Sequence, residues 1–221
     1  MGRMAWRAFL ATVLRGNILV HNHCYRADEM AQMLDLAKEF GYTVRAFHHA
    51  VEAYKIADLL KASGTGAAEW ADWAGFKMES NDSIKANLAI TDALGARAMI
   101  HSDSADGAQR LNQEVAKAMY AGRAAGINVT EDQAIRRLTI NPAWALALDD
   151  KIGSLEVGKN ADLVLWSGNP FSIYTKAEKV WIDGALMFDR DDAKERWRTS
   201  IMNPLYHARL AWIRGLFGFG F

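Results

Sequence analysis

Short apolar runs alternate with helical patterns from residue 1 to about residue 150, and this alternation constrains the fold more than any other feature. Buried strands are predicted at residues 17–22, 43–48, about 67–71 and 97–101. Helical spacing follows them at residues 27–40, 51–63, 83–94 and 108–125. Strands that alternate with helices form parallel sheets built from βα units. The sequence therefore predicts an α/β fold with about four βα units, half of what a (β/α)8 barrel needs.

Local signals predict where several helices begin and end. Gly41 ends the helix over residues 27–40, because glycine readily takes the left-handed conformation of a helix C-cap. Two further helices are predicted over residues 131–138 and 142–147, the first with Thr130 as its N-cap.

From about residue 153 the pattern changes to short strands. They are predicted at residues 162–166, 177–182 and 186–189, and Asp183-Gly184 is a hairpin turn signal between the last two. A small β-structure therefore follows the βα units. Residues 191–221 are predicted to form a helical tail.

Composition excludes several functional classes. Basic and acidic residues number 26 each, so the net charge is zero and no nucleic-acid partner is expected. No stretch reaches the roughly 18 apolar residues of a membrane span, and residues 1–15 predict an amphipathic helix instead. The single cysteine, Cys24, can form no internal disulfide. With no signal peptide seen, we expect a cytoplasmic protein.

Metal-compatible side chains follow three of the predicted strands. They are His21 and His23, then His48 and His49, and finally Asp103 flanked by His101. The C-terminal ends of parallel strands converge on one face of a β/α barrel, so these residues can meet at one metal ion. Imidazole and carboxylate suit zinc and related divalent metals, and metal-activated water suits hydrolysis.

Four segments resemble consecutive landmarks of the metal-dependent amidohydrolase superfamily, of the imidazolonepropionase and prolidase-like type. They are VHNH at residues 20–23, HHAVEAY at 48–54, HSDS at 101–104 and GSLEVGKNADLV at 153–164. The last is the most specific, because it resembles the crossing from the barrel into a small β-sandwich; T-x-N-P-A at residues 139–143 usually precedes it. The resemblance covers about residues 5 to 190 and only the C-terminal half of the family's fold.

The resemblance implies a domain organisation. It predicts half of an amidohydrolase TIM barrel at residues 1–150, part of a β-sandwich at 151–190, and an unmatched tail at 191–221. Four βα units leave sheet edges and an apolar face uncovered, so we expect a homo-oligomer or a partner that covers the open barrel face.

The resemblance also implies a site and an activity. His21 and His49 resemble the metal ligands of the fifth and sixth strands, and Asp103 the catalytic aspartate of the eighth, which also binds metal. Zinc or another divalent metal is the implied cofactor. The implied reaction is hydrolysis of a carbon–nitrogen bond in a small-molecule amide, cyclic amide or dipeptide-like substrate. Residues expected to contact substrate or support the ligands are His23, Arg26, His48, Tyr54 and His101.

The sequence departs from the family pattern at several points. The first-strand His-x-His pair and the fourth-strand ligand, commonly a carboxylated lysine, have no candidate in it. Trp144 and Ala147 stand where similar proteins tend to have lysine and glycine. A catalytically inactive, truncated remnant that acts as an assembly or binding module is therefore the alternative.

Alternatives also remain open for residues beside the predicted site. Trp70, Trp73 and Phe76 either form a loop that faces substrate or fill a core. Lys77 and Glu79 are interpreted as a solvated pair.

Overall fold

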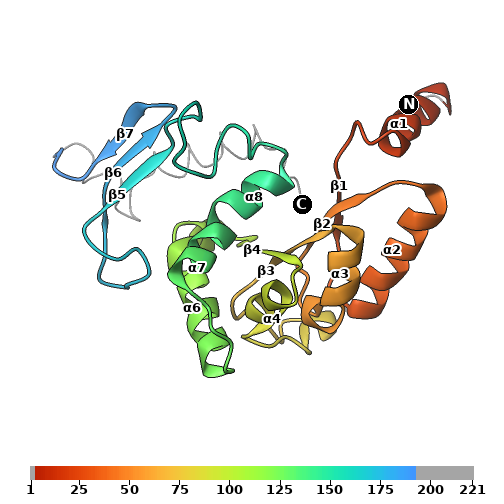
Figure 1. Cartoon of the computed structure of the whole chain (residues 1–221), viewed down its shortest axis with the longest axis horizontal. Helices are drawn as coiled ribbons and strands as arrows, with labels where there is room; N and C mark the ends of the chain where they lie inside the picture. The colour runs from red at the N-terminus through yellow and green to blue at the C-terminus, as the bar shows by residue number, and fades with distance from the viewer. Residues whose placement is uncertain (1–2, 193–221) are drawn as a thin grey trace.

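The structure, a computed structural model, describes residues 3–192 and contains a parallel sheet with helices around it (Figure 1). Its strands are β1 (Val20–His23), β2 (Val44–His48), β3 (Gly66–Glu69) and β4 (Arg97–Ile100), in the order β1-β2-β3-β4. All three neighbouring pairs are parallel. The predicted α/β architecture with a parallel sheet is confirmed, and each strand lies beside the next one along the chain.

The helices match the predicted pattern with local differences. Those of the first part are α1 (Arg3–Leu14), α2 (Ala27–Phe40), η1 (Ala53–Lys55), α3 (Ala57–Ser63), η2 (Met78–Ser80) and α4 (Asn87–Ala93). Those after β4 are α5 (Ala105–Ala108), α6 (Leu111–Ala124), α7 (Glu131–Leu138) and α8 (Ile140–Ala145). The single helix predicted over residues 51–63 is wrong: a 3-10 turn and a short α-helix share this segment.

Two helix ends follow their predicted signals. Gly41 adopts φ 72° after α2, and its amide donates a hydrogen bond to the carbonyl of Ala37. Thr130 caps α7 in a reciprocal arrangement, in which Gln133 bonds back to the cap backbone. These signals act within a few residues, so they are readable without tertiary structure.

The core lies on both faces of the sheet. One apolar cluster packs β2 against α2 and α3, and a second packs β4 against α4, α6 and α7. On the opposite face α8 covers Ala46, Ala68 and Met99. Trp144 of α8 lies between two guanidinium groups, 3.5 Å from that of Arg45 and 4.2 Å from that of Arg97. This face of the sheet is therefore closed near the strand starts.

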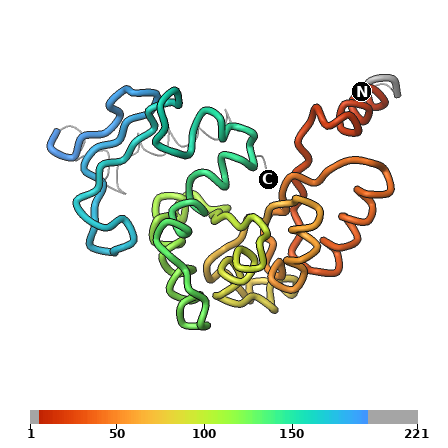
Figure 2. Tube along the Cα trace, in the orientation of Figure 1, coloured from red at the N-terminus to blue at the C-terminus, as the bar shows by residue number. Residues whose placement is uncertain are grey.

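A second sheet follows α8. It is antiparallel and consists of β5 (Leu163–Trp166), β6 (Ala177–Ile182) and β7 (Ala185–Asp189). The predicted hairpin turn is confirmed, since Asp183 and Gly184 adopt φ 51° and 77°. Figures 1 and 2 show this sheet at the end of the molecule opposite to α1.

The predicted amphipathic helix near the N-terminus is present as α1. The predicted helical tail falls almost entirely outside the described residues, which end at residue 192. Within residues 3–192, no helix has the length and apolarity needed to cross a membrane.

Candidate functional site

The ends of the four parallel strands lie together at one edge of the sheet. His23 is in register with His48 at the ends of β1 and β2. The His101 amide donates a hydrogen bond to the carbonyl of Glu69, which joins the ends of β4 and β3. Strand direction and register therefore bring the predicted histidines to a common edge, as expected for the C-terminal ends of parallel strands.

The histidines form two pairs at this edge. Nδ1 of His23 lies 2.7 Å from Nε2 of His49. Nδ1 of His21 lies 2.8 Å from Nε2 of His48, and Nε2 of His21 lies 3.1 Å from the carbonyl oxygen of Ala145. Both ring nitrogens of His21 are thus occupied by the chain itself.

This pairing differs from the expected combination of His21 with His49. His21 and His23 are two residues apart on one strand, so both side chains lie on the same face of the sheet. His23 is closer to the strand's C-terminal end, and His49 follows the last residue of β2. The spacing V-H-N-H alone leaves this choice of histidine open.

Burial lowers the pKa of four histidines of this cluster. Desolvation is the main cause that lowers the pKa of His48 and that of His49, each to about 4. It likewise lowers the pKa of His21, and it places that of His101 well below the usual value. Neutral imidazole is the form that binds a metal ion, so His49 is in the required state at neutral pH.

Two ring nitrogens of this cluster are buried without a hydrogen-bond partner among the described residues. They are Nδ1 of His49 and Nε2 of His101. Trp70 stacks against both rings, with centroid distances of 4.8 and 5.0 Å. Its indole N–H donates to the carbonyl of Ser102 at 3.0 Å, which fixes the ring in the strand-end loop. Buried polar atoms without partners in a histidine cluster indicate a place for another polar group.

Asp103 lies beside the cluster in an unusual backbone conformation. It follows β4, is exposed, and adopts φ 54°. Its charge acts on His49, whose pKa it raises against the effect of burial. His49 also has a positive φ, of 59°. Two predicted site residues therefore carry backbone strain, which is frequent at functional sites.

The remaining predicted site residues have other partners. Arg26 forms an exposed ion pair with Asp28 at 3.0 Å. The Tyr54 hydroxyl donates to the carbonyl of Asp82 at 3.0 Å. Neither has a hydrogen bond to the histidine cluster within the described residues.

Cys24 is buried, and burial raises the pKa of its thiol to about 11, which makes it unreactive.

The donor set fits a divalent metal in its chemistry. Converging imidazoles, buried ring nitrogens without a partner and a neighbouring carboxylate are ligand types that zinc takes. Within residues 3–192, however, no three such side chains are arranged as a group that could hold an ion. The structure therefore gathers a pair of donor nitrogens, not a closed ligand set.

The contact that Lys77 makes was not predicted from the sequence. Lys77 is not paired with Glu79; its ammonium lies 3.7 Å from the centroid of the Tyr25 ring. Tyr25 in turn stacks on His49 at 5.1 Å with an interplanar angle of 24°. Trp70 is buried, whereas Trp73 and Phe76 are 40% and 55% exposed, so this loop contributes both to the core and to the surface beside the cluster.

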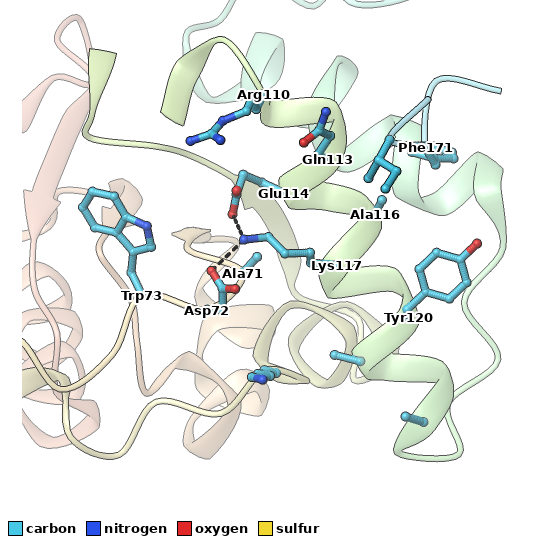
Figure 3. A pocket seen from close by; sticks show the side chains of 14 residues that line it. Ala71, Asp72, Trp73, Arg110, Gln113, Glu114, Ala116, Lys117, Tyr120 and Phe171 are labelled. Carbon is cyan, nitrogen blue, oxygen red and sulfur yellow. Dashed lines mark hydrogen bonds and ion pairs between the residues drawn. The ribbon is translucent and has the colours of Figure 1, made fainter. Parts of the chain in front are cut away.

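A separate pocket of about 730 Å³ is lined in part by Trp73, Lys117 and Tyr120 (Figure 3). Within it, Lys117 forms ion pairs of 2.8 Å with both Asp72 and Glu114. None of the clustered histidines lines this pocket. It is thus a neighbour of the candidate site and not part of it.

Glu69 at the end of β3 was also missed. Its side chain is fully buried, and desolvation raises its pKa well above the usual value. Thr91 and Arg137 moderate this effect, although neither carboxyl oxygen has a well-formed hydrogen bond. Arg137 instead bonds to Asp92 at 2.7 Å. The sequence around Glu69 does not indicate that its carboxyl group is buried, because the burial depends on helices far along the chain.

Comparison with known proteins adds the family context. The model of the family described as "Amidohydrolase family" matches residues 17–187. The amidohydrolase tasK of Hapsidospora irregularis is 29% identical over 191 residues, which are 84% of this chain and 19% of that protein.

Two solved structures are similar in fold. The amidohydrolase of Thermotoga maritima is 32% identical with a TM-score of 0.74, and the match covers 81% of this chain and 46% of that one. An adenosine deaminase from Xanthomonas campestris, with bound zinc, is 19% identical with a TM-score of 0.62, covering 90% and 50%. The chain thus spans about half the length of the solved structures it matches.

Proposed function

Because the chain belongs to the amidohydrolase family, we propose that it hydrolyses a carbon–nitrogen bond in a small substrate with the help of a divalent metal. The substrate class is an amide, a cyclic amide or a dipeptide-like molecule. Zinc is the expected metal, since the donors are imidazole nitrogens and a carboxylate. The zinc of the similar deaminase agrees with this choice.

The pairing of His23 with His49 is the observation that carries the proposal. Their facing nitrogens, 2.7 Å apart, converge at the strand ends. We assign His23 and His49 as the metal-holding histidines, in place of the sequence-based choice of His21. His21 has a structural role beside this pair, because its ring bonds to His48 and to the backbone of α8.

The proposed mechanism assigns a role to each group. A bound divalent metal supplies activation of water at neutral pH. Asp103 would join the two histidines as a ligand, and its carboxylate would accept the proton of the attacking water and deliver it to the leaving nitrogen. Trp70 and His101 pack against the His49 ring and hold its orientation.

The organisation of the whole chain is proposed on the same basis. Residues 1–150 form half of a barrel and 151–190 part of a β-sandwich. A second copy or a partner covers the open face. Nothing in the comparisons supports the alternative of an inactive assembly module.

Zinc content in matched histidine variants tests the proposal. We expect purified protein supplied with zinc to hold close to one equivalent, measured by elemental mass spectrometry after gel filtration. His23→Ala and His49→Ala should each lower the content at least about tenfold, because loss of one ligand opens the site. His21→Ala should retain zinc.

The same variants distinguish the possible errors. Zinc lost in His21→Ala but kept in His23→Ala would restore the sequence-based assignment. Well-folded protein that holds no zinc would contradict a metal site in this chain. For the reaction, Asp103→Asn should abolish hydrolysis of N-acyl amino acids; activity that survives this substitution would contradict the role of Asp103.

A further inference from the structure

Beside the histidine cluster lies a wall of aromatic rings that the metal chemistry does not require. Tyr25, Trp70 and Phe76 contact one another, with ring centroids 5.6 to 6.4 Å apart. Trp73 extends the wall by stacking on Trp70 at 5.6 Å. The wall begins at His49, against which both Tyr25 and Trp70 stack. An apolar group bound beside the donor nitrogens would lie on these rings.

A single cation is held against this wall. The Lys77 ammonium lies 3.7 Å from the centroid of the Tyr25 ring and 5.8 Å from that of Phe76. It is close enough to His49 for its charge to lower the pKa of that histidine. No carboxylate of the described residues lies within ion-pair distance of the Lys77 ammonium. Within the same residues, the ammonium donates no hydrogen bond.

The backbone of Lys77 is fixed, although its side chain is exposed. The carbonyl of Lys77 accepts hydrogen bonds from the amide of Ser80 at 3.1 Å and from its hydroxyl at 2.9 Å. Ser80 is fully buried. The ring face stabilises the cation on one side, while its N–H groups on the other side stay free to donate. A positioned cation without an anionic partner is suited to an anionic ligand.

We propose that Lys77 binds a carboxylate of the substrate, and that the exposed rings of Trp73 and Phe76, backed by Tyr25 and the buried Trp70, receive the apolar or aromatic group beside it. The inference rests on the proposed function and narrows its substrate class to acidic amides, such as N-acyl amino acids and dipeptides with an apolar side chain. Lys77 acts in recognition and takes no part in the proton transfers.

Binding of two uncleavable probes tests this assignment without turnover. The probes are 3-phenylpropionate and 3-phenylpropan-1-ol, which share the phenyl ring and differ in charge. Calorimetry on chelator-treated full-length protein should show about tenfold tighter binding of the carboxylate at low salt, the scale of a hydrogen bond to a charged group. The preference should fall as salt is added.

Three variants locate the effect. Lys77→Met should remove the preference and leave binding of the alcohol unchanged, and Lys77→Arg should restore most of it. Lys38→Met is the matched control. Lys38 lies exposed in the last turn of α2, which leads to the N-terminal end of β2 and so away from the site. It should leave the preference unchanged.

Each remaining outcome overturns the inference. A preference that persists in Lys77→Met assigns the carboxylate to another group. A preference seen only after zinc is supplied assigns it to the metal, which would support the proposed function while contradicting the role of Lys77. Equal binding of both probes contradicts it directly. Absence of hydrolysis, in contrast, concerns only the proposed function.

Discussion

His49 and Asp103 both have left-handed backbone conformations, which cost a residue other than glycine on the order of 1 kcal/mol or more. The sequence places both residues just after strands, so their position at the site could be predicted from the alternation of apolar runs and helices. Their strain could not, because it arises from the turns that follow β2 and β4 in the folded chain. Neither could the partner of His49, since His21 and His23 share one face of β1.

Ala147 shows the same conformation outside the site and gives a prediction for stability. It is exposed with φ 53°, at a position where the family resemblance implies glycine. Ala147→Gly should raise the free energy of unfolding by about 0.5–1 kcal/mol, because relief of strain exceeds the entropy that glycine adds to the unfolded chain. Urea denaturation measures this difference. Ala31→Gly, in the interior of α2, is the control and should lower stability by a similar amount; a loss in both variants would contradict the argument.

The buried imidazoles predict a stability that decreases in mild acid. The pKa values of His48 and His49 are about 4 in the folded chain because of burial, against about 6.5 in an unfolded chain. Between these values the unfolded chain binds more protons. The free energy of unfolding should therefore fall as pH decreases from about 6.5 to about 4, by at most ~1.4 kcal/mol per pH unit for each histidine. Above about pH 6.5 both histidines are neutral in the folded and the unfolded chain, and their contribution to the free energy of unfolding is complete. Because His48 is only half-buried, its contribution is smaller than ~1.4 kcal/mol per pH unit.

Glu69 acts in the opposite direction and supplies the control. Its raised pKa means that the folded chain keeps a proton that the unfolded chain loses above about pH 4.5, so its contribution decreases as pH rises. Denaturation between pH 4.5 and 6.5 should show a steeper rise of stability with pH in Glu69→Gln than in the unsubstituted protein. His48→Gln should show a shallower one. Equal slopes in all three proteins would exclude these groups as the cause.

At the scale of elements, signals contained within a few residues were sufficient to predict where helices and turns lie. Contacts between elements could not be predicted from them. The cap of α7 and the turn at Asp183 were found because their determinants are local. The helix predicted over residues 51–63 failed because Glu52 is used elsewhere: its carboxylate accepts a hydrogen bond from the Ala27 amide at 2.8 Å. This bond joins the start of α2 to the loop after β2, and no periodicity reports it.

Arg137 joins two helices, and its removal should be severe. It is buried in α7 and bonds to Asp92 at 2.7 Å, one residue before the end of α4. Arg137→Met removes the only basic partner that Asp92 has in the described ion pairs and withdraws the positive charge near Glu69. The expected loss is about 3 kcal/mol in the free energy of unfolding, measured by urea denaturation. Arg136→Met alters the same helix at an exposed position and should change stability by less than about 0.5 kcal/mol.

At the scale of the whole molecule, the order of the strands was predictable and the covering of the sheet was not. Strand order follows from short βα connections, which place each strand beside the next. The packing of α8 across one face depends on Trp144, which lies against Arg45 and Arg97. Trp144 lies 99 positions after Arg45 and 47 positions after Arg97 along the chain. A tryptophan in place of the family's lysine was noticed in the sequence, but its cationic partners become visible only in the fold.

The apolar surface around α1 leads to the last prediction, which concerns association. Phe9, Leu10 and Leu14 of α1 are 44 to 53% exposed, and Phe40 at the end of α2 is 60% exposed. Together with neighbouring residues they line an apolar groove of about 490 Å³ beside β1, which is an edge strand of the described sheet. Contiguous apolar surface next to an unpaired strand edge favours association.

We therefore expect the purified chain to associate with itself in a concentration-dependent way, as measured by sedimentation velocity between micromolar and tens of micromolar protein. Leu10→Glu should weaken this association at least about tenfold, because it introduces a charge into the apolar surface that must be desolvated on contact. Leu155→Glu is the matched control: Leu155 is 82% exposed in the loop before β5, away from α1, and its substitution should leave association unchanged. A monomer at every concentration would contradict self-association and leave a different partner as the cover of this surface. Equal weakening by both substitutions would show that general surface charge, rather than the groove beside α1, controls association.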